Sequence, residues 1–287
     1  MTSTIAIIDF ETTGLDPYSG DRPTEVAVVF VRNQQIVDRF QRLANPGRRI
    51  PSFVTSLTGI TDAMVRNAPP VETVMEELHQ KIGNIPLIAH NASFDKKFLD
   101  NEFERIGKER RQDFICSMRV ARRVLCSASD FKLGTLVKHV GLTFTSNAHR
   151  ALADAEMTAK LWAAMEQTLQ RKFGLQSVPL NLLERLQSVT IAKADEYIRN
   201  YARADSGRQA KAPAPRRPKT SHKVTVDASS HARKTPTRTR PSPDLPHFAE
   251  TVKCITCGYA ISVAEIDGIR WLKCPCCGFN TPQRYNG

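Results

Sequence analysis

The expected fold starts from Thr4-Ile5-Ala6-Ile7-Ile8-Asp9-Phe10-Glu11-Thr12-Thr13-Gly14, an apolar run that ends in two acids and is typical of a buried central strand. Side chains alternate across a strand, so Asp9 and Glu11 share one face, about 6 to 7 Å apart. Carboxylates this close repel each other, and burial raises both pKa values unless a cation lies between them. A divalent metal ion is the simplest such cation. The alternative is that the strand ends at Asp9 and both acids lie in an exposed turn.

The composition is that of a soluble globular protein. The chain has 287 residues, of which 41% are hydrophobic, enough for one buried domain and a smaller part. No apolar run approaches the length of a transmembrane helix, and the N-terminus lacks the basic and apolar regions of a signal peptide. We therefore expect no membrane partner and a cytoplasmic location, where the seven cysteines stay reduced.

The net charge of +12 is concentrated in one segment. Residues 1–202 carry 26 Lys and Arg against 23 Asp and Glu, or +3, residues 203–240 carry 11 against 2, or +9, and residues 241–287 carry 4 against 4. The basic segment is rich in proline and has few large apolar residues. It predicts a disordered linker over 203–246, which is either a solubilising tether or a segment attracted to a polyanion in a salt-dependent manner.

The apolar periodicity predicts an α/β fold. Strands are expected at 25–31 and 35–42, paired as a hairpin, and at 86–89 and 114–116, with helices at 71–82, 94–106, 119–125, 133–140 and 153–169. Strands that come first in a run and then alternate with helices indicate a mixed sheet with helices on its faces. The leucines between 174 and 202 add one or two further helices.

Two of the predicted helices also carry an acid on their apolar face. Asp95 falls on the stripe that includes Phe98, and Asp154 on the stripe that includes Met157. Each acid lies in the first turn, where a carboxylate often serves only as a cap. Four acids from three elements, each at an element's end and on a core-facing side, are nevertheless what a metal-binding cleft beside a sheet requires.

Three stretches carry a family resemblance: Asp9-Phe10-Glu11-Thr12-Thr13-Gly14, His90-Asn91-Ala92-Ser93-Phe94-Asp95 and His149-Arg150-Ala151-Leu152-Ala153-Asp154. They resemble, in order, the three motifs of the DEDDh branch of the DnaQ-like 3′–5′ exonucleases. Within residues 4–170 the likeness is to proofreading epsilon subunits of bacterial replicative polymerases and to stand-alone exonucleases built on the same domain. The resemblance implies a ribonuclease H-like fold over residues 1–172, and the apolar pattern beyond it predicts a helical extension over 173–202.

The resemblance also implies the roles of the site residues. The implied catalytic set is Asp9, Glu11, Asp95, His149 and Asp154. The four carboxylates would bind two Mg2+ or Mn2+ ions, which clamp the attacking and leaving oxygens of an in-line phosphoryl displacement. His149 would be the general base that takes a proton from the attacking water. His90 is assigned a structural role.

Substrate contacts are implied for Phe10, Thr12, Thr13, Ile60 and Asn91. The first three would meet the terminal nucleotide and its 3′-OH, and Asn91 would help to hold the strand. Ile60 would press against a base from the segment 50–61. In that segment a threonine, Thr58, stands where many relatives have His, a departure that leaves the metal site unaffected.

The C-terminal region carries a separate cysteine pattern. Two C-x-x-C pairs separated by 16 residues consist of Cys254, Cys257, Cys274 and Cys277. This spacing predicts a zinc ribbon over 247–287 that binds one structural Zn2+. Zinc would supply much of the folding free energy of so small a module. A disulfide framework and a redox C-x-x-C are the alternatives.

These features together predict a metal-dependent 3′–5′ exonuclease that releases nucleoside 5′-monophosphates from DNA 3′ ends, in repair, proofreading or processing. The expected partners are DNA with a free 3′ end and a polymerase or another replication or repair protein. One alternative is an exoribonuclease, because no residue identifies a group that senses a 2′-OH. The other is a nucleic-acid-binding adaptor with a vestigial domain, although the complete set of catalytic residues argues against it.

Overall fold

A computed structural model of the chain describes residues 4–143 and 149–210, and three short strands nearer the C-terminus. These strands are β6 (Ser262–Ile266), β7 (Ile269–Lys273) and β8 (Asn280–Gln283), and they form an antiparallel sheet in that order. The predicted linker beyond residue 210 and the four predicted zinc ligands lie outside the described residues. Within the described part of the chain, no helix is sufficiently long and apolar to cross a membrane.

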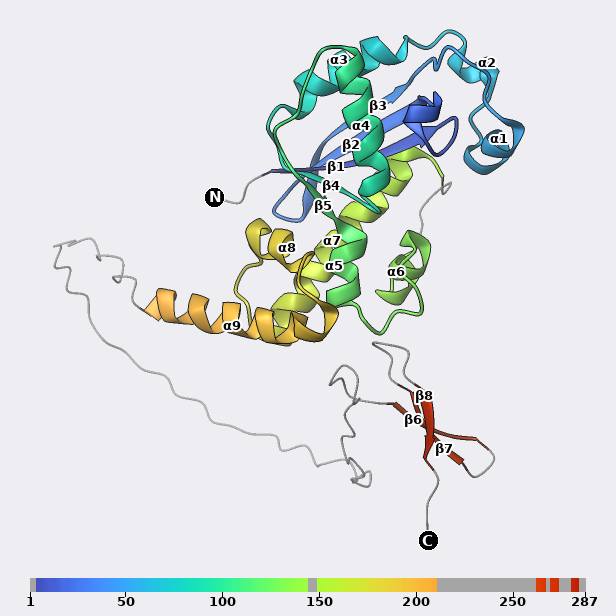
Figure 1. Cartoon of the computed structure of the whole chain (residues 1–287). Helices are drawn as coiled ribbons and strands as arrows, with labels where there is room; N and C mark the ends of the chain where they lie inside the picture. Colours follow the sequence, from blue (N-terminus) through green and yellow to red (C-terminus); the bar gives the residue numbers. More distant parts are fainter. Residues whose placement is uncertain (1–3, 144–148, 211–261, 267–268, 274–279, 284–287) are drawn as a thin grey trace, which may run out of the picture.

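The N-terminal domain is built on a mixed sheet in the order β3-β2-β1-β4-β5 (Figure 1). Its strands are β1 (Ile5–Thr12), β2 (Pro23–Arg32), β3 (Gln35–Leu43), β4 (Leu87–Ala89) and β5 (Phe114–Cys116). β1, β2 and β3 pair in antiparallel fashion, whereas β4 and β5 continue the sheet in parallel with β1. The prediction of a mixed sheet around β1 is therefore confirmed, and the strand continues through both acids to Thr12.

The β2–β3 hairpin turns at Asn33 and Gln34, which have positive φ values of 52° and 62°. Two consecutive positive φ values characterise the type I′ turn, whose twist matches that of the flanking strands. The hairpin predicted from the sequence is confirmed.

The helices of the described chain are α1 (Ser52–Thr58), α2 (Asp62–Val65), α3 (Val71–Ile82), α4 (Ser93–Arg105), α5 (Ser117–Val124), α6 (Leu133–His139), α7 (Ala151–Phe173), α8 (Leu180–Leu186) and α9 (Ile191–Ala210). The first two were not predicted, because they are too short to show a 3.6-residue repeat. α9 runs to Ala210, past residue 203, where the sequence placed the start of the linker.

The helices cover both faces of the sheet, and the alternation of β1 divides the core between them. Ile8 and Phe10 pack with α3 and α4 on one face, whereas Ile5 and Ile7 pack with α5 to α9 on the other (Figure 1). Trp162 of α7 is 2% exposed in the second layer. Burial of each such side chain contributes about 1.5–3 kcal/mol. Because the alternation continues, Asp9 and Glu11 point to the face covered by α7.

Candidate active site

Three carboxylates meet where β1 ends beneath the first turn of α7. One oxygen from each of Asp9, Glu11 and Asp154 lies within 4.8 Å of the other two. β1 supplies the first two, and α7, which packs across β1 and β2, supplies the third. All three are partly buried. Three convergent carboxylate oxygens are the donors that hard divalent ions such as Mg2+ and Mn2+ prefer.

Asp95 approaches the same place from the first turn of α4. Its Oδ1 accepts a hydrogen bond from the backbone amide of Phe10 at 3.2 Å, and the residue is only 2% exposed. Asp95 does not belong to the group of three convergent oxygens, but its charge contributes to the raised pKa of Asp9. Asp95 therefore lies close enough to Asp9 for their charges to interact.

The electrostatics of this cluster favour a cation. Burial raises the pKa of Asp9, and it raises the pKa of Glu11 to about 8. Repulsion by the neighbouring acids is the second cause of both shifts. Burial also raises the pKa of Asp154, and raises that of Asp95 to about 8. A divalent ion would replace this repulsion by attraction and displace the protons. The donor set thus fits the metal that the sequence predicts.

A fifth carboxylate, Glu25, lies behind the cluster. It is fully buried on β2, where its Cα pairs with that of Glu11. Arg150 donates to both of its oxygens, from Nε at 3.0 Å and Nη2 at 2.7 Å, and the Ala151 amide donates at 3.1 Å. Burial raises the pKa of Glu25, but the hydrogen bonds from Arg150 and Gln41 outweigh it and hold the pKa below its ordinary value. Glu25 therefore stays ionised and anchors the start of α7.

The pair formed by Glu25 and Arg150 was not predicted from the sequence. The available signal was an acid inside the apolar run of β2, which is buried from residue 23 to residue 31. A charged side chain in such a run requires a partner. Nothing in the sequence identifies that partner, because it lies 125 residues away.

His149 lies immediately before α7 and is exposed in the cleft that also contains Asp9 and Asp154. Its φ of 66° is left-handed, a conformation that costs an ordinary residue about 1–3 kcal/mol. Its backbone amide donates to Asp154 Oδ2 at 3.2 Å. This turn places His149 in the same cleft as Asp9 and Asp154, which is where a general base for their chemistry would have to lie.

A second buried ion pair fixes the chain between β1 and β2. Arg22 donates to both oxygens of Glu102 on α4, at 2.7 and 2.8 Å, and also to Glu72 on α3 at 2.8 Å. The backbone of Arg22 bonds in turn to Thr13, whose hydroxyl oxygen accepts from the Arg22 amide at 3.0 Å. Gly14 is required next, because a Cβ there would lie 2.3 Å from Asp21 Oδ2.

The predicted substrate residues have different surroundings. Asn91 is exposed and lines the cleft, with a left-handed φ of 62°. Phe10 is 4% exposed in the layer of α3 and α4, and Thr13 is 1% exposed. Thr12 is 7% exposed, and its hydroxyl donates to the Gly14 carbonyl. The side chains of these three residues are therefore largely enclosed by the protein, and the predicted nucleotide contacts stay a prediction.

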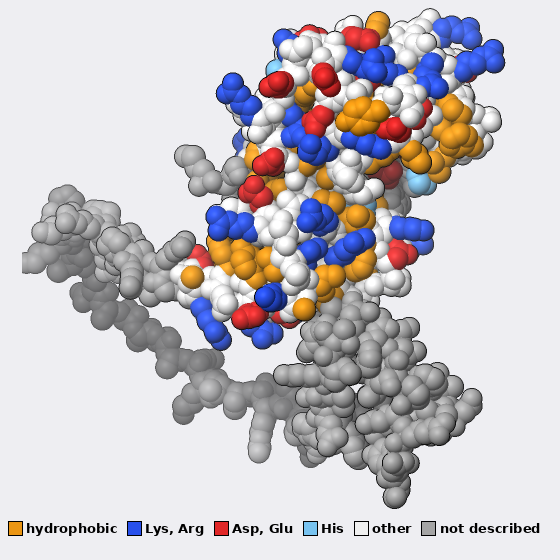
Figure 2. Space-filling model, viewed as in Figure 1, with side chains coloured by type: hydrophobic (Ala, Val, Ile, Leu, Met, Phe, Trp, Pro, Cys, Tyr) orange, Lys and Arg blue, Asp and Glu red, His pale blue; other side chains and the backbone are white. Residues whose placement is uncertain are grey.

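Ile60 is fully buried in a small cluster with Val54 and Val65, so it cannot reach a base in this conformation. The same segment exposes Phe53 and Leu57, which are 69% and 56% accessible. Figure 2 shows hydrophobic side chains gathered over α1 at this end of the molecule. The exposed apolar side chains of this segment thus belong to α1, a helix that was not predicted from the sequence.

His90 joins the end of β4 to the opposite side of the cleft. Its Nε2 donates to the Phe131 carbonyl at 3.0 Å, so its Nδ1 accepts from the Ser117 hydroxyl at 2.9 Å. Burial lowers the pKa of His90. Both ring nitrogens are used within the protein, which agrees with the structural role predicted for this residue.

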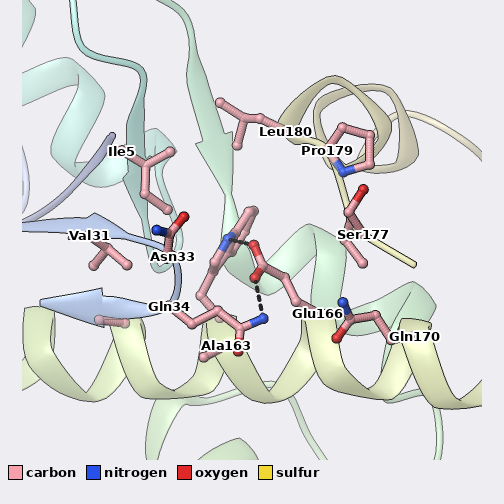
Figure 3. A pocket seen from close by; sticks show the side chains of 13 residues that line it. Ile5, Val31, Asn33, Gln34, Ala163, Glu166, Gln170, Ser177, Pro179 and Leu180 are labelled. Atoms are coloured by element: carbon pink, nitrogen blue, oxygen red, sulfur yellow. Dashed lines mark hydrogen bonds between the residues drawn. The ribbon is translucent and has the colours of Figure 1, made fainter. Parts of the chain in front are cut away.

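A second hollow, with a volume of about 580 Å³, lies on another side of α7 (Figure 3). Its most polar lining residue is Glu166, which accepts from Trp162 Nε1 at 2.9 Å and Gln34 Nε2 at 3.0 Å. Burial raises the pKa of Glu166. No metal-binding cluster lies there among the residues that the structure describes, so the cleft at the end of β1 is the candidate site.

Comparison with known proteins agrees with this geometry. Residues 6–162, more than half of the chain, match the family model described as Exonuclease. The chain belongs to the exonuclease family. In sequence, the exonuclease is 39% identical over 173 residues to the PolC-type DNA polymerase III of Oceanobacillus iheyensis, and 37% identical over 173 residues to that of Halalkalibacterium halodurans. The match covers 60% of this chain but 12% of either polymerase.

Solved structures that are similar to the exonuclease domain include two exonucleases bound to DNA. The E. coli exonuclease I complex with single-stranded DNA is 22% identical, with a TM-score of 0.53, over 60% of this chain and 42% of that one. Exonuclease X, solved with 5′-overhanging duplex DNA, is 29% identical, with a TM-score of 0.48, over 60% of this chain and 95% of that one. The likeness to exonuclease I shows the fold alone. The assignment to the exonuclease family rests on the match to the family model.

Proposed function

We propose that this exonuclease is a metal-dependent enzyme that removes nucleoside 5′-monophosphates from the 3′ ends of DNA. One observation carries the proposal: Asp9, Glu11 and Asp154 converge within 4.8 Å in the cleft that also exposes His149. The raised pKa values of the buried acids support a bound cation, because only a positive charge stabilises all of them in ionised form.

In the proposed mechanism, Asp9, Glu11 and Asp154 hold the metal, and Asp95 assists from α4. Bound divalent ions would orient the attacking water and neutralise charge on the leaving oxygen. His149 accepts the proton that the water loses as it attacks phosphorus. The bond between phosphorus and the O3′ of the preceding nucleotide breaks as the water attacks, and this O3′ takes a proton from solvent to become the new 3′-OH. The terminal nucleotide leaves with its phosphate on the 5′ oxygen.

The test uses the purified full-length chain with 5′-labelled single-stranded DNA and matching RNA, in Mg2+, in Mn2+ and in EDTA. We expect a ladder of products shortened from the 3′ end, absent in EDTA and in the Asp9→Asn and His149→Asn variants. The ratio of the rates on DNA and RNA identifies the preferred substrate, and faster RNA trimming would replace DNA by RNA in the proposal. Wild-type protein that binds DNA without shortening it would favour the adaptor alternative.

We further propose that the exonuclease works in DNA replication or repair in the cytoplasm, beside a polymerase or another protein of these processes. The identity of 39% with a PolC-type polymerase supports this proposal. Association can be tested by analytical ultracentrifugation of the chain with the replicative polymerase of its own organism. A complex of the two proteins would support a polymerase as the partner. If the two proteins sedimented separately at micromolar concentrations, a stand-alone enzyme would be favoured.

We also propose that Cys254, Cys257, Cys274 and Cys277 bind one structural Zn2+. The support is their spacing in the sequence and the antiparallel strands β6, β7 and β8 in the same region. Elemental analysis of the purified chain should give one zinc per molecule, and Cys254→Ser should lower this content. Stoichiometric disulfides with no zinc would contradict the proposal.

A further inference from the structure

The cleft that holds the acids has a second wall, which the mechanism above does not use. It is made of α5, α6 and the chain between them, and the cleft has a volume of about 870 Å³. Three cations on this wall line the cleft: Arg122, Lys132 and Lys138. We call these three residues, together with Phe131, the basic wall.

The segment that forms the basic wall is strongly positive. Residues 117–140 contain five Lys and Arg and one acid, a net charge of +4. The acid is Asp130, which accepts a hydrogen bond from the backbone amide of Lys132 at 2.9 Å. Figure 2 shows Lys and Arg side chains over the part of the surface where Figure 1 places α5 and α6. The wall thus faces the acidic end of β1 with the opposite sign of charge.

Among the residues that the structure describes, the cations of the basic wall form no ion pair, and Lys132 interacts with the nearby charge of Asp130 without pairing to it. Over residues 4–143 and 149–210, none of Arg122, Lys132 and Lys138 forms an ion pair, whereas cations elsewhere on the domain such as Arg42 and Arg110 do. Unpaired cations that line one cleft attract an anion from outside the protein. Lys and Arg in such a groove are the usual partners of nucleic-acid phosphates.

The basic wall also offers an aromatic surface between its charges. The Arg122 guanidinium lies 5.6 Å from the centre of the Phe131 ring, and that ring is partly exposed. The Phe131 carbonyl accepts from His90, which fixes this point of the wall relative to β4. Cations interleaved with a ring are typical of surfaces that bind a single strand, because phosphates take the charges and unpaired bases stack on the ring.

We propose that the basic wall binds the nucleotides upstream of the cleavage site, so that the exonuclease takes a single-stranded 3′ end. This proposal rests on the exonuclease function proposed above. The terminal phosphate lies at the acids of β1, and the preceding phosphates contact Lys132 and Lys138. A paired end would have to unpair before its bases reached Phe131.

The test compares wild type with the double variant Lys132→Gln/Lys138→Gln on two substrates. One is a 20-mer of dT, and the other is the p-nitrophenyl ester of thymidine 5′-monophosphate, which has no upstream nucleotide. We expect KM for the 20-mer to rise roughly tenfold with little change in kcat, and kcat/KM for the ester to change by less than twofold. The slope of log(1/KM) against log[salt] should become shallower by about 1.4, or about 0.7 for each lost contact.

Lys160→Gln is the matched control, because Lys160 lines a different surface with Gln35 and Arg39. It should leave both substrates unaffected. The proposal would be overturned if the double variant kept the wild-type KM and salt slope for the 20-mer, or if it lost activity on the ester to the same extent.

Binding separates a failure of this proposal from a failure of the proposed function. Anisotropy of a fluorescent dT 20-mer in EDTA should show a Kd about tenfold weaker for the double variant, even if no substrate is hydrolysed. A blunt duplex of the same length should lose less affinity than the single strand. If the double variant lost equal affinity for the single strand and the duplex, single-strand selection would be contradicted. An unchanged Kd for the 20-mer would exclude the basic wall as a binding surface.

Discussion

Glu25 and Arg150 form a partly buried bidentate ion pair, with Nε to Oε2 at 3.0 Å and Nη2 to Oε1 at 2.7 Å. Glu25 lies on β2 opposite Glu11, and Arg150 lies between His149 and the first residue of α7. The pair therefore ties the strand beside the acids proposed to bind metal to the chain that carries His149. We expect the relative positions of Glu11, His149 and Asp154 to depend on this pair.

The first prediction concerns Glu25→Gln, which leaves Arg150 without its anionic partner. We expect kcat to fall about 10- to 100-fold, as is typical when a residue that orients metal ligands is replaced, with a much smaller change in KM. Glu166→Gln is the control, because this partly buried carboxyl lies in the second hollow, away from the acids (Figure 3). Equal kcat values for wild type and Glu25→Gln would show that the pair has no positioning role.

The second prediction separates the chemistry of His149 from its backbone conformation. Both His149→Asn and His149→Ala should lower kcat by about 10²- to 10⁴-fold, because each removes the general base. At a φ of 66°, however, Asn is tolerated, whereas Ala is strained and should lower the unfolding free energy by about 1–2 kcal/mol. Steady-state kinetics and urea unfolding measure the two effects. An Asn variant with near wild-type kcat would remove His149 from the mechanism.

The third prediction concerns pH and metal together. Because the pKa of Glu11 is raised from 4.5 to about 8, the metal-free folded protein binds more protons than the unfolded chain within this range. Its unfolding free energy should therefore fall as pH rises from about 5 to 8. Mg2+ competes with these protons, so the rise in Tm that it causes should be larger at pH 8 than at pH 6.

Differential scanning fluorimetry with Mg2+ and with EDTA measures this effect. Glu11→Gln removes the titrating group, so it should stabilise the metal-free protein at pH 8 and reduce the response to Mg2+. A response to Mg2+ that shrinks between pH 6 and pH 8 would show that the acids do not take up protons in the way that their burial implies.

The fourth prediction concerns the buried pair of Arg22 and Glu102. Glu102→Ala should lower the unfolding free energy by about 3–5 kcal/mol, because Arg22 keeps a partly buried charge whose buried partner is lost. On the same helix, Lys96→Gln breaks the exposed pair with Asp100 and should cost less than about 1 kcal/mol. Chemical denaturation provides the comparison. If Glu102→Ala and Lys96→Gln lowered the unfolding free energy by similar amounts, the burial of Glu102 would not make its pair with Arg22 more important for stability than an exposed pair.

Much of the fold follows from local patterns in the sequence. The apolar run of β1 places Asp9 and Glu11 on one face, and the helical stripes place Asp95 and Asp154 in first turns, all as predicted. Such patterns are readable because a strand and a helix repeat every 2 and 3.6 residues, whatever lies elsewhere in the chain. For α1 and α2 no repeat was visible, and the burial of Ile60 followed from the packing of these short helices.

The sequence by itself thus determined which residues are proposed to carry the chemistry and which face each of them occupies. Only the tertiary structure decided what holds them in place, since Glu25 finds Arg150 at a separation of 125 residues and Arg22 finds Glu102 at a separation of 80. It also decided which cations stay unpaired beside the cleft. The physical reason is that local periodicity depends on neighbours along the chain, whereas a buried charge is satisfied by whichever group the folded chain brings within hydrogen-bonding distance.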